Sequence, residues 1–556
     1  MVDTTIFPAR RVVTLDPSQP VVDAVAVRDG RILAAGSIEE CASWGPHQVD
    51  DRFAELVLVP GMIEAHAHSL EGAFALLPYV GWFDRHRLGG IAPGIRSYDA
   101  LIERLAELDQ EMRNAGAATS EALVVTGFDP IYFRDEERLT RTHLDRVGTE
   151  RPIFVFHASA HLATVNSAML ERHEITRESA TVGVARDAGG EPNGELQEIP
   201  AMSLASSGLQ PILRAMNDPA SIDALGQICA NQGITMLTDL ASAGLQRPES
   251  QELWHATVNR DDFPARILQR HIAALPAGST DWAEAADRIE QFRAADTDKL
   301  RTAGLKVLLD GSIQGFTAKM DWPGYYTGTD HGIWMTPPEQ VLDICRPFHE
   351  RNINIHTHCN GDLTVDLWID TVEQLVLERP WLDHRHTVQH CQLTSAAQYR
   401  RMARLGMCAN IFTNHIWYWG DQHHDLTVGP ERARRMEACR TAEREGVSFS
   451  IHSDASVTPL GHLHTMWCAV NRVTPSGRVL GPDERISASS ALRAVTLGSA
   501  YQLHLDDEFG TVECGKAADF TVLAEDPLEV DPMSIKDIDV WGTVIGGCAF
   551  EAQNTG

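Results

Sequence analysis

Lysine is scarce in this chain of 556 residues, which contains 47 lysine and arginine residues together but 77 acidic ones. The resulting formal net charge of −30 argues against a surface built for nucleic acid or an anionic membrane. The few lysines are Lys299, Lys306, Lys319, Lys516 and Lys536. A lysine inside an apolar strand therefore calls for a specific explanation, and Lys306 in "GLKVLLDGS" is such a residue.

The sequence also lacks any apolar run of about 18 residues, the length that a membrane-spanning helix needs. Its beginning, "MVDTTIFPARRVVTLDPSQP", contains no apolar segment typical of a signal peptide. The ten cysteines are scattered without CxxC pairs, a usage typical of a reducing compartment. We therefore expect a cytoplasmic protein without a membrane segment.

Apolar segments with strand character alternate with segments of helical character in the second half of the chain. Examples of the first kind are "GITMLTDLAS", "ARILQRHIA", "LKVLLDGS", "NINIHTHCNGD", "HTVQHCQL", "MCANIFTNHIW" and "VSFSIHSDASV". Such alternation predicts parallel pairing of the strands. With "AELVLVPGMIEAHAHS" as the first strand the count is eight, which predicts a (β/α)8 TIM-type barrel of mixed α/β class.

The remaining segments predict further domains, because 556 residues exceed a single compact core. More than 160 residues separate the first predicted strand from the second, so we expect an inserted domain over the barrel mouth. Both ends of the chain are rich in strand and turn residues, which favours one composite β-sandwich. The predicted division is 1–59 with 500–556 for the β-sandwich, 60–499 for the barrel and 70–225 for the insertion.

Histidine and aspartate gather at the predicted ends of the barrel strands. His66 and His68 end strand one, and side chains two apart on an extended backbone point the same way. His358, His390 and Asp454 end strands five, six and eight. Because these ends meet at one rim of a barrel, the five groups should lie together. Imidazoles and a carboxylate suit zinc and similar divalent ions, so the pattern predicts a metal centre.

The chemistry expected of such a centre is hydrolysis. A divalent ion in a partly dry mouth lowers the pKa of a bound water toward about 7, and Asp454 could move the proton of that water to a leaving group. A protonated Lys306 cannot bind a cation, but burial lowers the pKa of a lysine. A neutral amine can add carbon dioxide, and the resulting carbamate could hold two ions side by side.

These motifs resemble those of the amidohydrolase superfamily, and within it the YtcJ-like amidohydrolases, which include N-substituted formamide deformylases. The resemblance spans nearly the whole chain and also rests on "AVAVRDGRILAAGS", "GFDPIYF", "HLATVNSAML", "GEPNGELQE" and "GTVECGKAADFTVL". It implies one or two divalent ions, most often Zn²⁺, bound by His66, His68, Lys306 as a carbamate bridge, His358, His390 and Asp454. It further implies that Asp454 acts as general base and then as general acid, and it allows for a homodimer.

Other residues near these motifs have less specific signals. We expect His356, His386 and His452 to support the ligands or to pack in the core. Cys359 and Cys391 stand where relatives usually have alanine, and they either pack or alter the metal preference. The motif "HSDAS" also has serine where relatives often have proline.

Candidate substrate-binding residues lie in three segments. In "TNHIWYWGDQHHD", Trp417, Tyr418 and Trp419 either bury a loop or wall an apolar pocket. Asp310 either orients the ligands or closes a turn. The resemblance places His161 of the inserted segment near the active site.

The function expected is hydrolysis of a carbon–nitrogen bond in a small linear non-peptide amide, an N-acyl or N-formyl amine. The alternatives on the same scaffold are a cyclic-amide or ester hydrolase and a deaminase. A deaminase is disfavoured for two reasons. Relatives that are deaminases usually have a glutamate after strand five, and "HTHCNGD" has none. Deamination would also leave Lys306 without a role. A non-catalytic binding protein is disfavoured because no expected ligand is missing.

Overall fold

The computed structural model describes residues 4–133, 137–242, 245, 248–273, 281–328 and 331–553. The chain divides into two compact units. The inserted unit contains Ser69–Leu225 and Ser456–Pro459, and the larger unit contains the rest of the described chain. None of the helices in the described ranges is both long and apolar enough to cross a bilayer.

Eight parallel strands of the larger unit form one sheet. Within this set of eight, each strand pairs with the member that comes before or after it along the chain. They are β6 (Met62–Ala67), β14 (Ile234–Asp239), β15 (Arg266–Ala273), β16 (Leu300–Leu308), β17 (Ile355–Cys359), β18 (Thr387–His390), β19 (Cys408–Ile411) and β20 (Ser448–Ile451). The predicted (β/α)8 TIM-type barrel is thereby confirmed.

Hydrogen bonds at the carboxyl ends of β6 and β20 bring the first and last strands of this barrel together. The backbone N–H of His68 donates to the carbonyl of Ala455 at 2.5 Å. The Glu64 carboxylate accepts bonds from the backbone N–H and the hydroxyl of Ser453, at 3.0 and 2.5 Å. Residues 66–68 and 452–455 are therefore held side by side at the rim.

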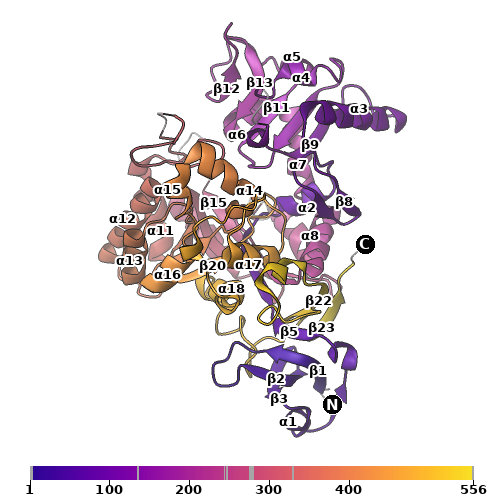
Figure 1. Ribbon diagram of the computed structural model, residues 1–556, viewed down its shortest axis with the longest axis vertical. Helices are drawn as coiled ribbons and strands as arrows, with labels where there is room; N and C mark the ends of the chain where they lie inside the picture. The colour runs from indigo at the N-terminus through magenta and orange to yellow at the C-terminus, as the bar shows by residue number, and fades with distance from the viewer. Residues whose placement is uncertain are drawn as a thin grey trace. The chain divides into compact units, whose positions relative to one another are not determined.

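Helices of the larger unit follow the barrel strands, and in Figure 1 α11, α12, α13 and α16 lie outside the barrel. The helix α13 illustrates how the sequence sets their bounds: Ser395 and Gln398 form a capping box, and Gly406 ends the helix with φ 74°. The other bounds are α10 (Trp282–Arg293), α11 (Pro338–Glu350), α12 (Asp362–Glu378), α13 (Ala396–Leu405), α14 (His415–Gln422), a π-helix (His423–Thr427), α15 (Gly429–Ala433), α16 (Cys439–Glu445), α17 (His462–Asn471), α18 (Ala488–Ala494) and α19 (Leu497–Gln502). The helix α9 (Pro248–Val258) lies between β14 and β15, and α8 (Pro219–Asn231) precedes β14.

The stretch that we predicted as one first strand, 54–69, forms two strands in different sheets. The strand β5 (Val57–Pro60) pairs with strands from the two ends of the chain, whereas β6 belongs to the barrel. Gly61 separates them, and a Cβ atom there would lie 2.3 Å from Thr235 Oγ1. The chain thus passes from one sheet to the other at a position where a larger side chain would collide with β14.

Strands from both ends of the chain form a second sheet in the larger unit, in the order β23-β22-β21-β5-β1-β2-β3, with β4 on β1. Its members besides β5 are β1 (Thr4–Val13), β2 (Val21–Arg28), β3 (Arg31–Gly36), β4 (His47–Val49), β21 (Phe520–Leu523), β22 (Val540–Ile545) and β23 (Cys548–Glu551), and α1 (Ile38–Ala42) follows β3. Phe7, Phe53 and Phe520 lie in its core. The exact domain boundaries stay a prediction.

The inserted unit contains a five-stranded sheet of order β12-β13-β11-β10-β9. Its strands are β9 (Leu123–Phe128), β10 (Ile153–His157), β11 (Leu162–Val165), β12 (Val184–Arg186) and β13 (Pro192–Gln197), with a small hairpin β7 (Arg85–Arg87) and β8 (Gly90–Ala92). Its helices are α2 (Leu70–Ala75), α3 (Tyr98–Asn114), α4 (Arg141–Leu144), α5 (Ser167–Arg172), α6 (Glu198–Leu204) and α7 (Ser206–Ala215). Its place over the barrel mouth stays a prediction.

Candidate metal centre

The end of β6 carries the first two candidate ligands. The His66 side chain is 1% exposed and that of His68 24% exposed. His66 Nδ1 is 2.6 Å from the amide oxygen of Gln389, which can only accept, so this nitrogen carries the hydrogen. His66 Nε2 is therefore left with a free electron pair, and it lies 3.4 Å from Asp454 Oδ1. Gln389 thus holds the His66 ring in an orientation suited to binding a cation.

Asp454 follows β20 and faces both of these histidines. Its Oδ1 is 3.3 Å from His68 Nε2, and the ligand atoms of His66, His68 and Asp454 all lie within 4.8 Å of one another. Burial alone would raise the pKa of Asp454, but the hydrogen bond from His68 and nearby positive charges lower it below its ordinary value. Asp454 is therefore ionised at neutral pH. Two imidazoles and a carboxylate so arranged fit a divalent ion such as Zn²⁺.

Lys306 lies on the inner face of β16, beside His66. Its Nζ is 3.5 Å from His66 Nε2, and the residue is 1% exposed. Among the residues that the structure describes, Lys306 makes no ion pair within 4.0 Å. Burial lowers the pKa of Lys306 to about 7, against the opposing effect of Asp454. A neutral amine is thus available at physiological pH, as the carbamate hypothesis requires.

His358 and His390 lie together but reach the centre in different ways. His358 pairs in register with Gln389, so Gln389 occupies the inward position of β18. His390 follows it and turns inward because its backbone is left-handed, with φ 73°. Its Nε2 is then 3.0 Å from His358 Nδ1, and its Nδ1 is 3.7 Å from Asp454 Oδ2. The structure therefore brings all six predicted ligands to one end of the barrel.

His452 lies closer to these ligands than a purely supporting residue would need to. Its ring stacks on His66 with centroids 4.6 Å apart, and its Nε2 is 3.2 Å from His390 Nδ1. His66, His390 and His452 form a second group whose nitrogen atoms lie within 4.8 Å of one another. Asn410 binds the other ring nitrogen of His452 at 3.0 Å. His452 therefore offers a ligand atom to the same centre.

The other two supporting histidines differ from each other. His356 Nδ1 accepts a bond from Gln389 at 2.7 Å, so it supports His66 through Gln389. His386 precedes β18 and contacts His349 at 2.9 Å and the backbone N–H of Ile355 at 3.1 Å. It belongs to a separate buried cluster. The two cysteines are buried, and Cys391 Sγ donates to the carbonyl of Val388, as a packing residue would.

Asp310 closes loops. It is fully buried and accepts bonds from the backbone N–H groups of Lys319, Asn360 and Gly361 and from the Thr364 hydroxyl. These bonds tie the loop after β16 to the loop after β17. Burial raises the pKa of Asp310 to about 7. Its nearest approach to a candidate ligand is 3.7 Å, to His358 Nε2.

The predicted substrate-binding aromatics lie on α14 with unequal exposure. Trp419 is 1% exposed and packs against Phe412 and His415, so it belongs to the core. Trp417 is half-buried and packs against Trp467, with ring centroids 5.4 Å apart. His161 belongs to the inserted unit, where its Nδ1 is 2.9 Å from Glu198 Oε2. A role for His161 near the centre stays a prediction.

Three buried residues that hold the ligands were missed in the sequence: Glu64, Gln389 and Asn410. Glu64 accepts from the backbone N–H of His66 at 3.0 Å, and burial raises its pKa to about 8. Asn410 donates to Gln389 at 2.9 Å. A signal existed for Glu64, because a charged residue two positions before His66 in an apolar strand shares the inward face.

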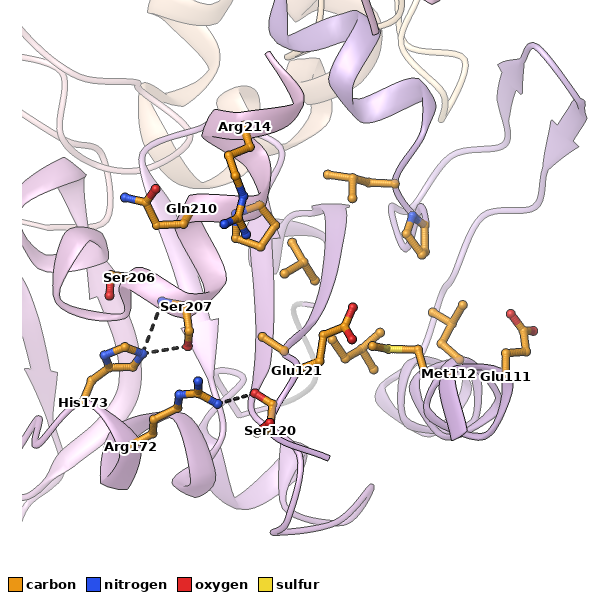
Figure 2. Close-up of a pocket in the computed structure, with 17 residues that line it drawn as sticks. Glu111, Met112, Ser120, Glu121, Arg172, His173, Ser206, Ser207, Gln210 and Arg214 are labelled. Atoms are coloured by element: carbon orange, nitrogen blue, oxygen red, sulfur yellow. Dashed lines mark hydrogen bonds between the residues drawn. The ribbon is translucent and has the colours of Figure 1, made fainter. Parts of the chain in front are cut away.

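A separate cavity of about 800 Å³ lies within the inserted unit (Figure 2). It is lined by the length of α7, the second half of α3, the start of β9 and the end of α5. His173 binds the Ser207 hydroxyl at 2.7 Å on one wall. Arg172 donates to the carbonyl of Ser120 on another wall. It contains none of the predicted ligands or substrate residues.

Comparisons with known proteins identify the family of the chain. The model of the Amidohydrolase family matches residues 54–548. The YtcJ protein of Bacillus subtilis is 24% identical over 94% of this chain and 95% of its own. The N-substituted formamide deformylase of Arthrobacter pascens is 25% identical over 96% of each chain. A metal-dependent hydrolase from Pyrococcus horikoshii has the same fold, with a TM-score of 0.70 over 95% of this chain and 99% of its own at 18% identity. The chain therefore belongs to the amidohydrolase family, and it is a hydrolase that acts on carbon–nitrogen bonds.

Proposed function

We propose that this protein hydrolyses the C–N bond of a linear non-peptide amide, an N-acyl or N-formyl amine. The observation that carries the proposal is the juxtaposition of an ionised Asp454 with His66, His68 and a buried Lys306. The similarity to an N-substituted formamide deformylase over 96% of both chains supports this substrate class.

Six residues would hold the divalent metal, for which Zn²⁺ is the best match to the donor atoms. His66, His68 and Asp454 would bind one ion, and His358 and His390 a second. Lys306 would bridge the two after its neutral amine has added carbon dioxide, with loss of one proton, to give a carbamate. When bound, the metal supplies polarisation of the amide carbonyl and a lowered pKa for water.

Asp454 is the proposed proton carrier. The hydrogen bond from His68 and nearby positive charges keep the pKa of its carboxyl low although the residue is buried, so it can accept a proton at neutral pH. We place on its carboxylate the proton of the attacking water, which it then delivers to the departing nitrogen. This second transfer matters because an amine anion is a poor leaving group.

The test combines elemental analysis of the purified protein with a substrate screen. The screen contains formamides, acyl amines, lactams and esters, assayed with the zinc-loaded protein. We expect stoichiometric metal and turnover of the formamides or acyl amines. Turnover confined to lactams or esters would contradict the proposed substrate class, and a protein that takes up no stoichiometric metal would contradict the centre itself.

A further inference from the structure

A histidine–glutamate pair lies at the barrel end that carries the candidate metal centre. His415 is the first residue of α14, which follows β19, and it is 1% exposed. Its Nδ1 is 2.8 Å from Oε1 of Glu437, which is fully buried. Neither residue is among the proposed ligands, so this buried polar pair needs another explanation.

The ring of Phe412 links His415 with the metal centre. The Phe412 centroid is 4.1 Å from that of His415, 4.9 Å from that of His452 and 5.8 Å from that of His390. Burial lowers the pKa of His415 well below its ordinary value, so its ring is neutral at physiological pH. His415 and two residues of the centre, His390 and His452, therefore pack around the same Phe412 ring.

Glu437 fixes the ring of His415. The other carboxyl oxygen of Glu437 has no hydrogen-bond partner among the described residues. The nearby Arg472 donates to the main-chain carbonyls of Met436, Glu437 and Leu480. Burial raises the pKa of Glu437 well above its ordinary value, although Arg472 opposes this. A protonated Glu437 donates to His415 Nδ1, which leaves the ring hydrogen of a neutral His415 on Nε2.

We propose that His415 Nε2 donates a hydrogen bond to the carbonyl oxygen of the scissile amide, and that Glu437 is its positioning residue. This inference rests on the proposed function, because it names a contact in the same reaction. Negative charge develops on that oxygen during attack, and a fixed donor in a dry site stabilises the charge without reorganisation.

His423 provides a matched control inside the same buried cluster. Its ring centroid is 5.8 Å from that of His415. Both of its ring nitrogens are used within the protein, Nδ1 by the Thr427 hydroxyl at 2.8 Å and Nε2 by the Gln392 amide at 2.9 Å. His423→Phe should therefore lower the melting temperature as His415→Phe does, without the effect on catalysis.

The first experiment measures kcat and KM of zinc-loaded variants for an N-formyl amine and its thioformyl analogue. For His415→Phe we expect kcat to fall about 100-fold with KM nearly unchanged, because an interaction of the transition state is lost. The loss should be smaller for the thioformyl analogue, since sulfur accepts weaker hydrogen bonds. Glu437→Leu should resemble His415→Phe, and Glu437→Gln should restore most of the activity, because its amide can donate to Nδ1. An equal loss of kcat in His423→Phe would overturn the inference.

A second measurement separates this inference from the proposed function. Acetohydroxamate carries a carbonyl oxygen and requires no turnover, and its Kd is measured by titration calorimetry on the zinc-loaded proteins. We expect Kd to rise about tenfold in His415→Phe and to stay unchanged in His423→Phe. If the protein hydrolyses no amide but this difference persists, the proposed function fails while the contact stands. Equal Kd values in the two variants, or no binding to the unaltered protein, would overturn the inference.

Discussion

Left-handed backbone occurs at two residues of the candidate metal centre, His390 and Asp454, and at the adjacent Cys391. His390, Cys391 and Asp454 have φ values of 73°, 52° and 53°, a region that non-glycine residues rarely adopt. Each costs on the order of 1–3 kcal/mol, so the surrounding structure must hold it in place. Alternation along a strand would have aimed Gln389 inward and His390 outward. The sequence therefore predicts which histidines matter, but it does not show how His390 reaches the centre.

Replacement of Asp454 by asparagine tests the proton carrier. We expect Asp454→Asn to keep metal through its amide oxygen and the histidines, while kcat/KM falls by about 10²–10⁴, the usual contribution of a proton-transferring group. Metal content by elemental analysis and kinetics on the same preparation check this. Retained turnover would remove Asp454 from the role, and loss of all metal would show that it acts mainly as a ligand.

Replacement of Lys306 by alanine tests the carbamate bridge. Lys306→Ala should lose most activity and part of the metal, because two anionic oxygens disappear from the centre. Small carboxylic acids such as acetate should partly restore both, since they can occupy the vacated space. Lys306→Met, which fills that space, is the matched control and should not respond to acetate. Full activity of Lys306→Ala would argue against a bridge.

At the scale of elements, the join between β5 and β6 shows that a sequence pattern does not determine which sheet a strand belongs to. The apolar stretch 54–69 reads as one strand, because nothing local reveals that Gly61 packs against Thr235 of a strand far away in the sequence. The alternation of apolar strand-like segments with helical ones nevertheless predicted the barrel. Local patterns therefore identified the strands, whereas the assignment of a strand to a sheet depended on distant contacts.

Substitution of Gly61 tests this join. A Cβ there would lie 2.3 Å from Thr235 Oγ1, so Gly61→Ala should lower the free energy of unfolding by about 1–3 kcal/mol, as overpacking does. Gly89→Ala is the matched control, because a Cβ at Gly89 would meet nothing within 4 Å. Denaturant unfolding measures both. Equal stability of the two variants would contradict the close approach of β6 to β14.

A buried histidine cluster that precedes β18 should make stability depend on pH. His384 Nδ1 accepts from the backbone N–H of His386 at 2.9 Å, and its Nε2 donates to the carbonyl of Leu405 at 2.7 Å. Burial lowers the pKa of His384 to about 4, below the 6.5 expected when unfolded. The unfolded state therefore binds more protons between these values, so stability falls as pH drops from about 6.5 to about 4.

The measurement is the melting temperature of the protein and of His384→Gln from pH 7 to pH 4.5. The variant should be less stable at pH 7 and should lose less stability on acidification, by about 1–3 kcal/mol. His47→Gln, at an exposed position, serves as the control and should follow the original pH dependence. Parallel curves for the original protein and His384→Gln would contradict the role of His384.

At the scale of the whole molecule, groups that are hundreds of residues apart meet because parallel strands end at one rim. This assembly was predicted from four strand ends, "GMIEAHAHS", "HTHCNGD", "QHCQL" and "HSDAS". The structure brings their histidines and aspartate together. The residues that orient them could not be predicted, because amides such as Gln389 and Asn410 have no distinctive spacing. Their role appears only once neighbouring strands are placed side by side.

The most direct test of this account is anomalous diffraction at the zinc edge from crystals of the zinc-loaded protein. The account predicts a peak bonded to His66, His68 and Asp454, and none of comparable height elsewhere except beside His358 and His390. Zinc bound away from these imidazoles, or their rings turned apart in the loaded protein, would contradict it.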